Sequence, residues 1–188
     1  MNSNKILKTL RTFFTLSLFF APLALFGQTV ERTQPSIHTL SYLKGNISDK
    51  TEAVKKSAEE GDISLCLKAL DFATQEKEAL AKDEEFKVLV KTAVSCLNTE
   101  NASQIEKDQA AQNLSQIFLS FDDEELRISV LEKIKTISSQ KSVSLLNSFV
   151  SDKIHRKEAI DDLTLKAIEL LKEIGDKSSF TSLFLADI

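Results

Sequence analysis

From about residue 48 to the end of the chain, apolar side chains recur at steps of three and four residues. This spacing gathers them on one face of a helix, because an α-helix turns once every 3.6 residues. A shorter stripe of Ile37, Leu40 and Leu43 predicts a helix that starts near Pro35-Ser36 and ends at Gly45. The longer pattern predicts helices over residues 48–60, 63–73, 86–97, 105–121, 126–137, 143–150, 159–174 and 179–188, with a bend or frayed end at 76–85 and polar residues at 151–158.

The segments between the predicted helices carry residues that favour helix starts. Asp62 follows Gly61 and is expected to be the N-cap of the next helix. Ser103 and Glu106 have the spacing of a capping box. We expect Ile105 among the apolar residues of the helix that follows this box. The serine-rich side of the 143–150 helix is expected to be exposed, with Ser142, Ser144, Asn147 and Ser148 on it.

The composition supports a purely helical fold. The chain of 188 residues has two prolines, neither beyond position 35, and four glycines. A β-rich domain needs many more turn glycines than this. We therefore predict an all-α domain of ordinary size.

Residues 1–27 have a different composition from the rest. Lys5, Lys8 and Arg11 precede a mostly apolar run from Phe13 to Phe26, which is the layout of a signal peptide. We predict a signal peptide at 1–27 and a periplasmic or secreted mature protein. Leu25 fits poorly with the small residues preferred before a cleavage site. An uncleaved segment that anchors the chain in the inner membrane is therefore the alternative.

The helical pattern itself repeats. A shift of 37 positions lays the helix at 126–137 on the one at 159–174, with Leu126 on Leu163, and continues into the helices that follow. The turn Gly61-Asp62 recurs 114 residues later as Gly175-Asp176, which is three steps of 38. Helix pairs repeating at this interval stack on their neighbours to build a shared core.

The segment 166–176, followed by Phe180 and Leu183, resembles a HEAT or HEAT-like repeat, as do residues 48–73 and 126–150. The resemblance implies a short right-handed α-solenoid of about four antiparallel helix pairs over residues 48–188, after a linker and short helix at 28–47. It also implies a surface for binding proteins. No unit has the proline common in the first HEAT helix, and Ala58 to Asp62 with Ala69 could equally resemble a tetratricopeptide repeat.

The net charge and the positions of histidine and cysteine argue against several classes of function. Removing the three cations of residues 1–27 changes the net charge from −4 to −7, which argues against a nucleic-acid partner. His38 and His155 each stand alone, so the sequence predicts no metal site, no cofactor and no catalytic site. Cys66 and Cys96 lie in apolar helical patterns, where either a disulfide or two reduced buried thiols is possible.

Two segments are candidates for binding a protein partner. The acidic run Asp122, Asp123, Glu124 and Glu125 opens a helix, where carboxylates are favoured by the helix dipole and could also attract a basic partner. The last helix carries Phe180, Leu183 and Phe184, and no later repeat covers it. We therefore expect an exported, non-enzymatic interaction or scaffold module whose last helix is covered by a second subunit, a partner or a part of the chain missing from this sequence. A membrane-tethered structural or assembly component of the envelope is the alternative.

Overall fold

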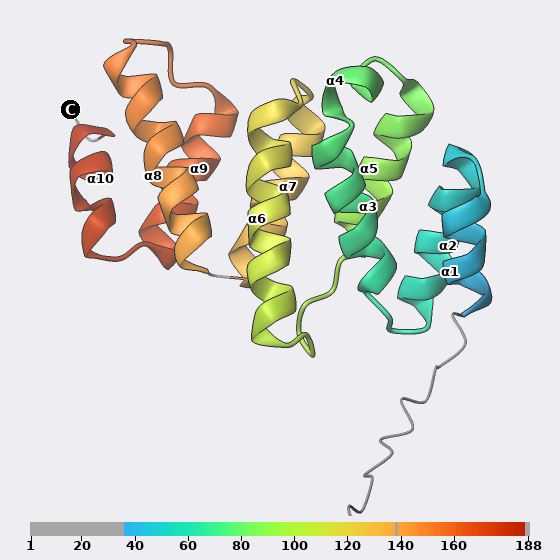
Figure 1. Ribbon diagram of the computed structural model, residues 1–188. Coiled ribbons are helices and arrows are strands. Elements are labelled where there is room, and N and C mark those ends of the chain that lie inside the picture. The colour runs from blue at the N-terminus through green and yellow to red at the C-terminus, as the bar shows by residue number, and fades with distance from the viewer. Residues whose placement is uncertain (1–35, 138, 187–188) are drawn as a thin grey trace, which may run out of the picture. The chain divides into compact units, whose positions relative to one another are not determined.

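The computed structural model describes residues 36–137 and 139–186, and every regular element in these two ranges is helical, which confirms the all-α class (Figure 1). The predicted signal peptide lies outside the described residues and stays a prediction. The elements are α1 (Ile37–Lys44), α2 (Ile47–Glu59), α3 (Ser64–Gln75), α4 (Lys77–Leu80), α5 (Glu84–Cys96), α6 (Gln104–Ser120), α7 (Glu124–Ile137), α8 (Gln140–His155), α9 (Asp162–Ile174), a 3₁₀ turn (Lys177–Ser179) and α10 (Phe180–Ala186).

Local side-chain chemistry fixes several of the helix starts. The capping box at the start of α6 is confirmed: Glu106 N–H donates to Ser103 Oγ at 3.3 Å, and Ser103 N–H donates to Glu106 Oε2 at 2.8 Å. Asn46 and Asp49 form a second box at the start of α2. Such caps satisfy amide groups that have no partner within the helix, and each contributes about 1 kcal/mol.

The helices pack in two rows (Figure 1). In one row α2 packs on α5, α5 on α7, and α7 on α9. In the other, α3 packs on α6, α6 on α8, and α8 on α10. Contacts between the rows join α2 with α3, α3 with α5, α6 with α7, and α8 with α9. Each helix therefore contacts its near neighbours in the chain.

The core lies between the two rows, and the predicted inner faces form it. The apolar face predicted for α7 is entirely buried and comprises Leu126, Val130, Leu131, Ile134 and Ile137. The face predicted for α5 and its C-cap is also buried and comprises Phe86, Leu89, Val90, Ala93, Val94 and Leu97. Aromatic side chains link successive helices. Phe72 meets Phe86 edge-on at 5.8 Å between ring centroids, and Phe118 of α6 meets Phe149 of α8 edge-on at 4.9 Å. Such pairs add about 0.5–1.5 kcal/mol beyond the burial of their area.

Some predicted helix limits were wrong. The helix predicted at 143–150 continues to His155, and Lys157 then adopts a positive φ of 54° that ends it. The next helix begins at Asp162 rather than at 159, because Asp161 provides the N-cap. The last helix is preceded by a 3₁₀ turn, in which Asp176 Oδ1 accepts from Ser178 N–H at 2.8 Å. The bend predicted at 76–85 is a separate short helix, α4.

Two predicted side-chain positions were also wrong. Ile105 is 80% exposed, because it lies in the first turn of α6. Ser142 is fully buried at the start of α8, where its hydroxyl lies 2.9 Å from that of Ser139.

The cap predicted for α3 was also wrong. Asp62 does not occupy the N-cap position of α3, which is Ile63, although the Asp62 carboxylate accepts from Ser64 N–H at 2.8 Å.

Candidate interaction surfaces

The acidic run at the start of α7 is partly neutralised by two nearby cations, one from α5 and one from α7 itself. Lys91 of α5 lies 3.2 Å from Asp123 and 2.7 Å from Glu125, and Arg127 lies 3.2 Å from Asp122. Asp123 also accepts from the Leu126 amide at 2.9 Å. This amide and Lys91 lower the pKa of Asp123, and the Glu125 carboxylate raises the pKa of Lys91. Charges that are paired in this way attract a basic partner less strongly than four free carboxylates would.

Aspartates at the starts of α5 and α9 have the same local role. Asp83 Oδ1 accepts from the amides of Glu85 and Phe86, and Asp161 Oδ1 accepts from the Thr164 amide at 2.8 Å and its hydroxyl at 2.6 Å. The Thr164 hydrogen bonds lower the pKa of Asp161. Three successive helix pairs thus each begin with a helix capped by an aspartate, namely Asp83, Asp123 or Asp161. Helix capping accounts for the acidic residues at these positions.

The last helix exposes two aromatic rings. Phe180 is 71% exposed and Phe184 is 57% exposed, and their rings stack with 6.0 Å between centroids and an interplanar angle of 16°. Leu183, predicted with them, instead packs partly buried against the core. Polar contacts hold the 3₁₀ turn and α10 on α8. Asn147 Nδ2 donates to Ser178 Oγ of the turn at 3.1 Å, and the hydroxyls of Ser151 in α8 and Ser182 in α10 lie 2.9 Å apart. The helix is thereby anchored with its aromatic pair facing solvent.

A second apolar surface lies on α1, and the sequence did not identify it as a site. The predicted stripe exists, but it faces outward: Ile37 is 77% exposed, Leu43 63% and Leu40 40%. Tyr42 occupies the inner side instead and is buried, which raises the pKa of its phenol to about 12. The burial of one large aromatic residue decides which face of so short a helix turns inward. In the sequence, a tyrosine beside the apolar stripe was the pattern that could have predicted this orientation of α1.

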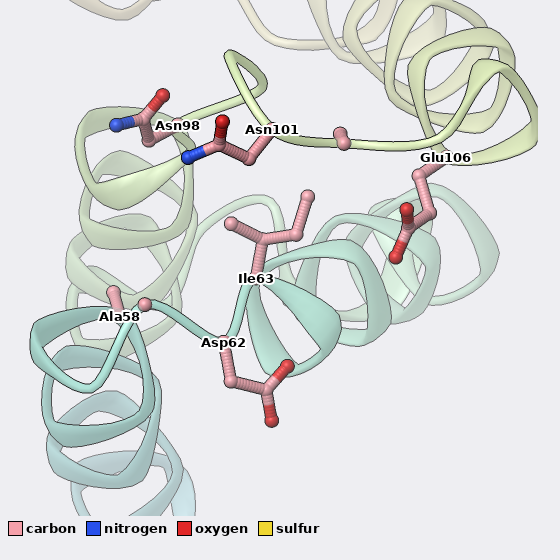
Figure 2. Close-up of a pocket in the computed structure, with 8 residues that line it drawn as sticks. Ala58, Asp62, Ile63, Asn98, Asn101 and Glu106 are labelled. Carbon is pink, nitrogen blue, oxygen red and sulfur yellow. The ribbon is translucent and has the colours of Figure 1, made fainter.

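A polar pocket of about 220 Å³ lies between the α2–α3 turn and the loop from α5 to α6 (Figure 2). Gly61 in the turn has a φ of 82°, a conformation that glycine adopts without strain. The Asp62 carboxylate accepts from Ser64, and the Glu106 carboxylate accepts from Ser103, which lowers the pKa of Glu106. Asn98 Oδ1 accepts from the Glu100 amide at 3.0 Å. These polar groups are used in forming the turns and the helix start.

Each of the two cysteines and two histidines has its own local surroundings. Cys66 is fully buried in α3, and burial raises the pKa of its thiol to about 12; Cys96 is half-buried, and both are free thiols. His38 bonds to Glu60 at 2.9 Å, and His155 Nδ1 lies 2.7 Å from the Ser151 carbonyl. Within residues 36–137 and 139–186, no three His, Cys, Asp or Glu side chains form a metal-binding group. In the same ranges no helix is long and apolar enough to cross a bilayer.

Comparison of the chain with protein-family models, with curated proteins and with solved structures gives no match.

Proposed function

We propose that the chain is a HEAT-like α-solenoid that acts in the cell envelope as a protein-interaction module, with its last helix as the main docking surface. The single observation that carries the proposal is the exposed aromatic pair Phe180 and Phe184. Exposed aromatic clusters on small domains are typical of binding sites, because each ring contributes a large apolar area when a partner covers it.

The packing of the helices supports the solenoid part of the proposal. Each row continues by adding one helix beside the preceding one, as stacked repeats do. The helix starts also keep the interval read from the sequence. Asp83, Asp123 and Asp161 follow one another at steps of 40 and 38 residues, and each caps the first helix of a pair.

The repeat register explains why the last helix is the docking surface. A shift of 37 positions places Phe180 on Val143 and Phe184 on Asn147. In α8, Val143 is 4% exposed, and Asn147 bonds to Ser178 beside the next helix. The positions that α8 uses for packing are thus occupied in α10 by exposed aromatic rings. A partner that covers α10 would take the place of a further repeat.

Site-specific photocrosslinking tests this proposal. A photoreactive phenylalanine analogue is introduced in place of Phe184 in the full-length protein, which is expressed in its native cells. We expect one dominant crosslinked partner in the envelope fraction. The matched control carries the analogue in place of Lys68, an exposed residue of α3, and is expected to give no such product.

The outcome also identifies the kind of partner. A crosslinked product at twice the mass of the chain indicates a second copy, and a different mass indicates another protein. Loss of the product in the Phe180→Ser variant supports docking on the aromatic pair. Equal crosslinking at positions 184 and 68, or none at either, contradicts the proposed function.

One observation favours a second candidate function, a membrane-tethered structural component. The exposed stripe of Ile37, Leu40 and Leu43 follows the apolar run at 13–26 by only about ten residues in the sequence. An apolar helix face near an anchor can lie against the bilayer surface. Sequencing the N-terminus of the protein isolated from its native cells distinguishes the two candidates. A start near residue 28 contradicts tethering, and an intact residue 1 supports it.

A further inference from the structure

The 3₁₀ turn and α10 pack on the fold with a polar side inward. Ser179 of the turn is 1% exposed and Ser182 of α10 is 4% exposed, whereas Phe180 and Phe184 face solvent. A surface helix normally buries its apolar side, because the removal of apolar area from water is what holds it in place. Of the three residues Phe180, Leu183 and Phe184, Leu183 packs partly buried against the core. The packing of α10 therefore uses little of its apolar surface.

Hydrogen bonds between polar side chains join α8 to the turn and α10. The Ser182 hydroxyl lies 2.9 Å from the Ser151 hydroxyl and 3.4 Å from the Asn147 carbonyl oxygen. Gln140 Nε2 donates to Asp176 Oδ2 at 3.1 Å. Such bonds exchange for hydrogen bonds to water when the contact opens, so their net contribution to stability is small. They hold α10 less firmly than the aromatic contact between α6 and α8 holds those two helices.

Two buried polar atoms at this junction have no partner. Asn147 Nδ2 donates to the Ser178 hydroxyl, which itself donates to Asp176 Oδ1 at 2.6 Å. The other side of the same amide, Asn147 Oδ1, is buried without a hydrogen-bond partner among the described residues, and so is Ser179 Oγ. A buried polar atom without a partner is unfavourable, and contact with water removes this cost. Opening of the junction would therefore satisfy both atoms.

Gly175 connects α9 to the turn and can act as the hinge. A methyl group at this position would overlap the Leu171 carbonyl oxygen and lie 2.7 Å from Ser179 Oγ. The packed turn therefore has room only for glycine. Glycine is also the residue that restricts the backbone least, so the connection adapts easily when the turn moves.

The apolar residues of α10 form one stripe. Phe180, Leu183 and Phe184 have the spacing i, i+3 and i+4, which places them on the same side of a helix. A helix that docks in an apolar groove of another protein uses anchors at this spacing. In the packed state the core covers the edge of the stripe at Leu183, so only the two rings are presented.

We propose that residues 177–186 form a latch, which swings away from α8 about Gly175 and inserts Phe180, Leu183 and Phe184 into an apolar groove of the partner protein. The inference rests on the proposed function, in which α10 is the docking surface. It adds that the partner binds α10 in its released state and that packing on α8 restrains binding.

An engineered disulfide that closes the latch tests its opening. The Ser151 and Ser182 hydroxyl oxygens are close enough for cysteines at these positions to form a disulfide. In the full-length protein, we expect the oxidised Ser151→Cys/Ser182→Cys variant to slow amide hydrogen exchange in α10 at least about tenfold relative to the reduced variant. Gly175→Ala is expected to speed this exchange several-fold and to leave α5 unchanged. Exchange in α10 that the disulfide does not slow overturns the latch.

Photocrosslinking with the latch closed tests the insertion. The photoreactive analogue at position 184 is combined with the two cysteine substitutions, and isolated envelopes are irradiated before and after reduction with dithiothreitol. We expect at least about tenfold less crosslinked product while the disulfide is intact, and recovery after reduction. The control carries Ser182→Cys alone and is expected to give the same yield in both conditions.

The two proposals fail in different ways. An unchanged yield with the disulfide intact contradicts the latch and leaves α10 standing as a rigid docking surface. The absence of product in both conditions contradicts the proposed function, and the insertion with it.

Discussion

Two phenylalanine pairs in this protein have opposite surroundings. Phe118 and Phe149 come from different helices, α6 and α8, and meet edge-on at 4.9 Å with Phe118 only 1% exposed. Phe180 and Phe184 come from one helix, α10, and stack in solvent with 6.0 Å between their centroids. The residue type is the same, but only the first pair has a following helix to pack against. The inner pair therefore stabilises the fold, while the terminal pair remains available for binding.

The largest expected effect comes from breaking the inner pair. Phe118→Ala removes a fully buried ring and leaves a cavity between α6 and α8, so we expect the free energy of unfolding to fall by about 3–5 kcal/mol. Urea denaturation followed by far-UV circular dichroism measures this change. Phe118→Leu serves as the control and is expected to cost less, since part of the volume is retained. A loss below about 1 kcal/mol for the alanine variant means that the Phe118 ring contributes little to the packing of α6 on α8.

An intermediate effect is expected at the start of α7, which lies between Phe118 and Phe149 in the chain. Asp123→Ala removes the cap and the contact with Lys91, so we expect a loss of about 1–2 kcal/mol at pH 7. Asp123→Asn keeps a capping side chain and isolates the charge. Urea denaturation of the two variants and the unaltered protein measures both contributions.

The effect at Asp123 depends on pH in a definite direction. The pKa of Asp123 is lowered in the folded protein by the Leu126 amide and Lys91, below the ordinary aspartate value of about 3.9. The folded state therefore binds this proton more weakly than the unfolded state does. The stabilisation is present above the unfolded pKa and disappears as pH falls through the folded pKa. The difference between the unaltered protein and Asp123→Asn is expected to be constant from pH 7 to 5 and to shrink below about pH 4. A difference that persists at pH 2 contradicts this assignment.

The smallest effect on stability is expected at the terminal pair. Replacing both Phe180 and Phe184 with serine removes exposed rings only, so the free energy of unfolding is expected to change by no more than about 0.5 kcal/mol. The binding of a hydrophobic fluorescent dye by the native protein is expected to fall strongly in the same variant. A large loss of stability indicates instead that the pair belongs to the core.

The sequence predicted the buried faces well where neighbouring helices run the length of the predicted face. On α7 every predicted inner residue is buried, because α5 and α9 both pack on it. Ile105 has the same apolar character, yet it remains exposed in the first turn of α6. Periodicity gives the direction of a side chain from its own helix, and it contains no information on where a neighbour ends. For the same reason, spacing alone could not show that Leu183 packs against the core while Phe180 and Phe184 do not.

The pattern of packing also has a consequence for how the chain folds. The described helices that pack closely on one another are at most three positions apart in chain order. Short sequence separations require little loop-closure entropy, so this topology favours folding in the microsecond-to-millisecond range. It also allows α9 and α10 to open while α2, α3 and α5 stay folded. The exposed aromatic pair thus belongs to a unit that can open without the rest of the fold, and a partner bound there would slow the amide hydrogen exchange of this unit.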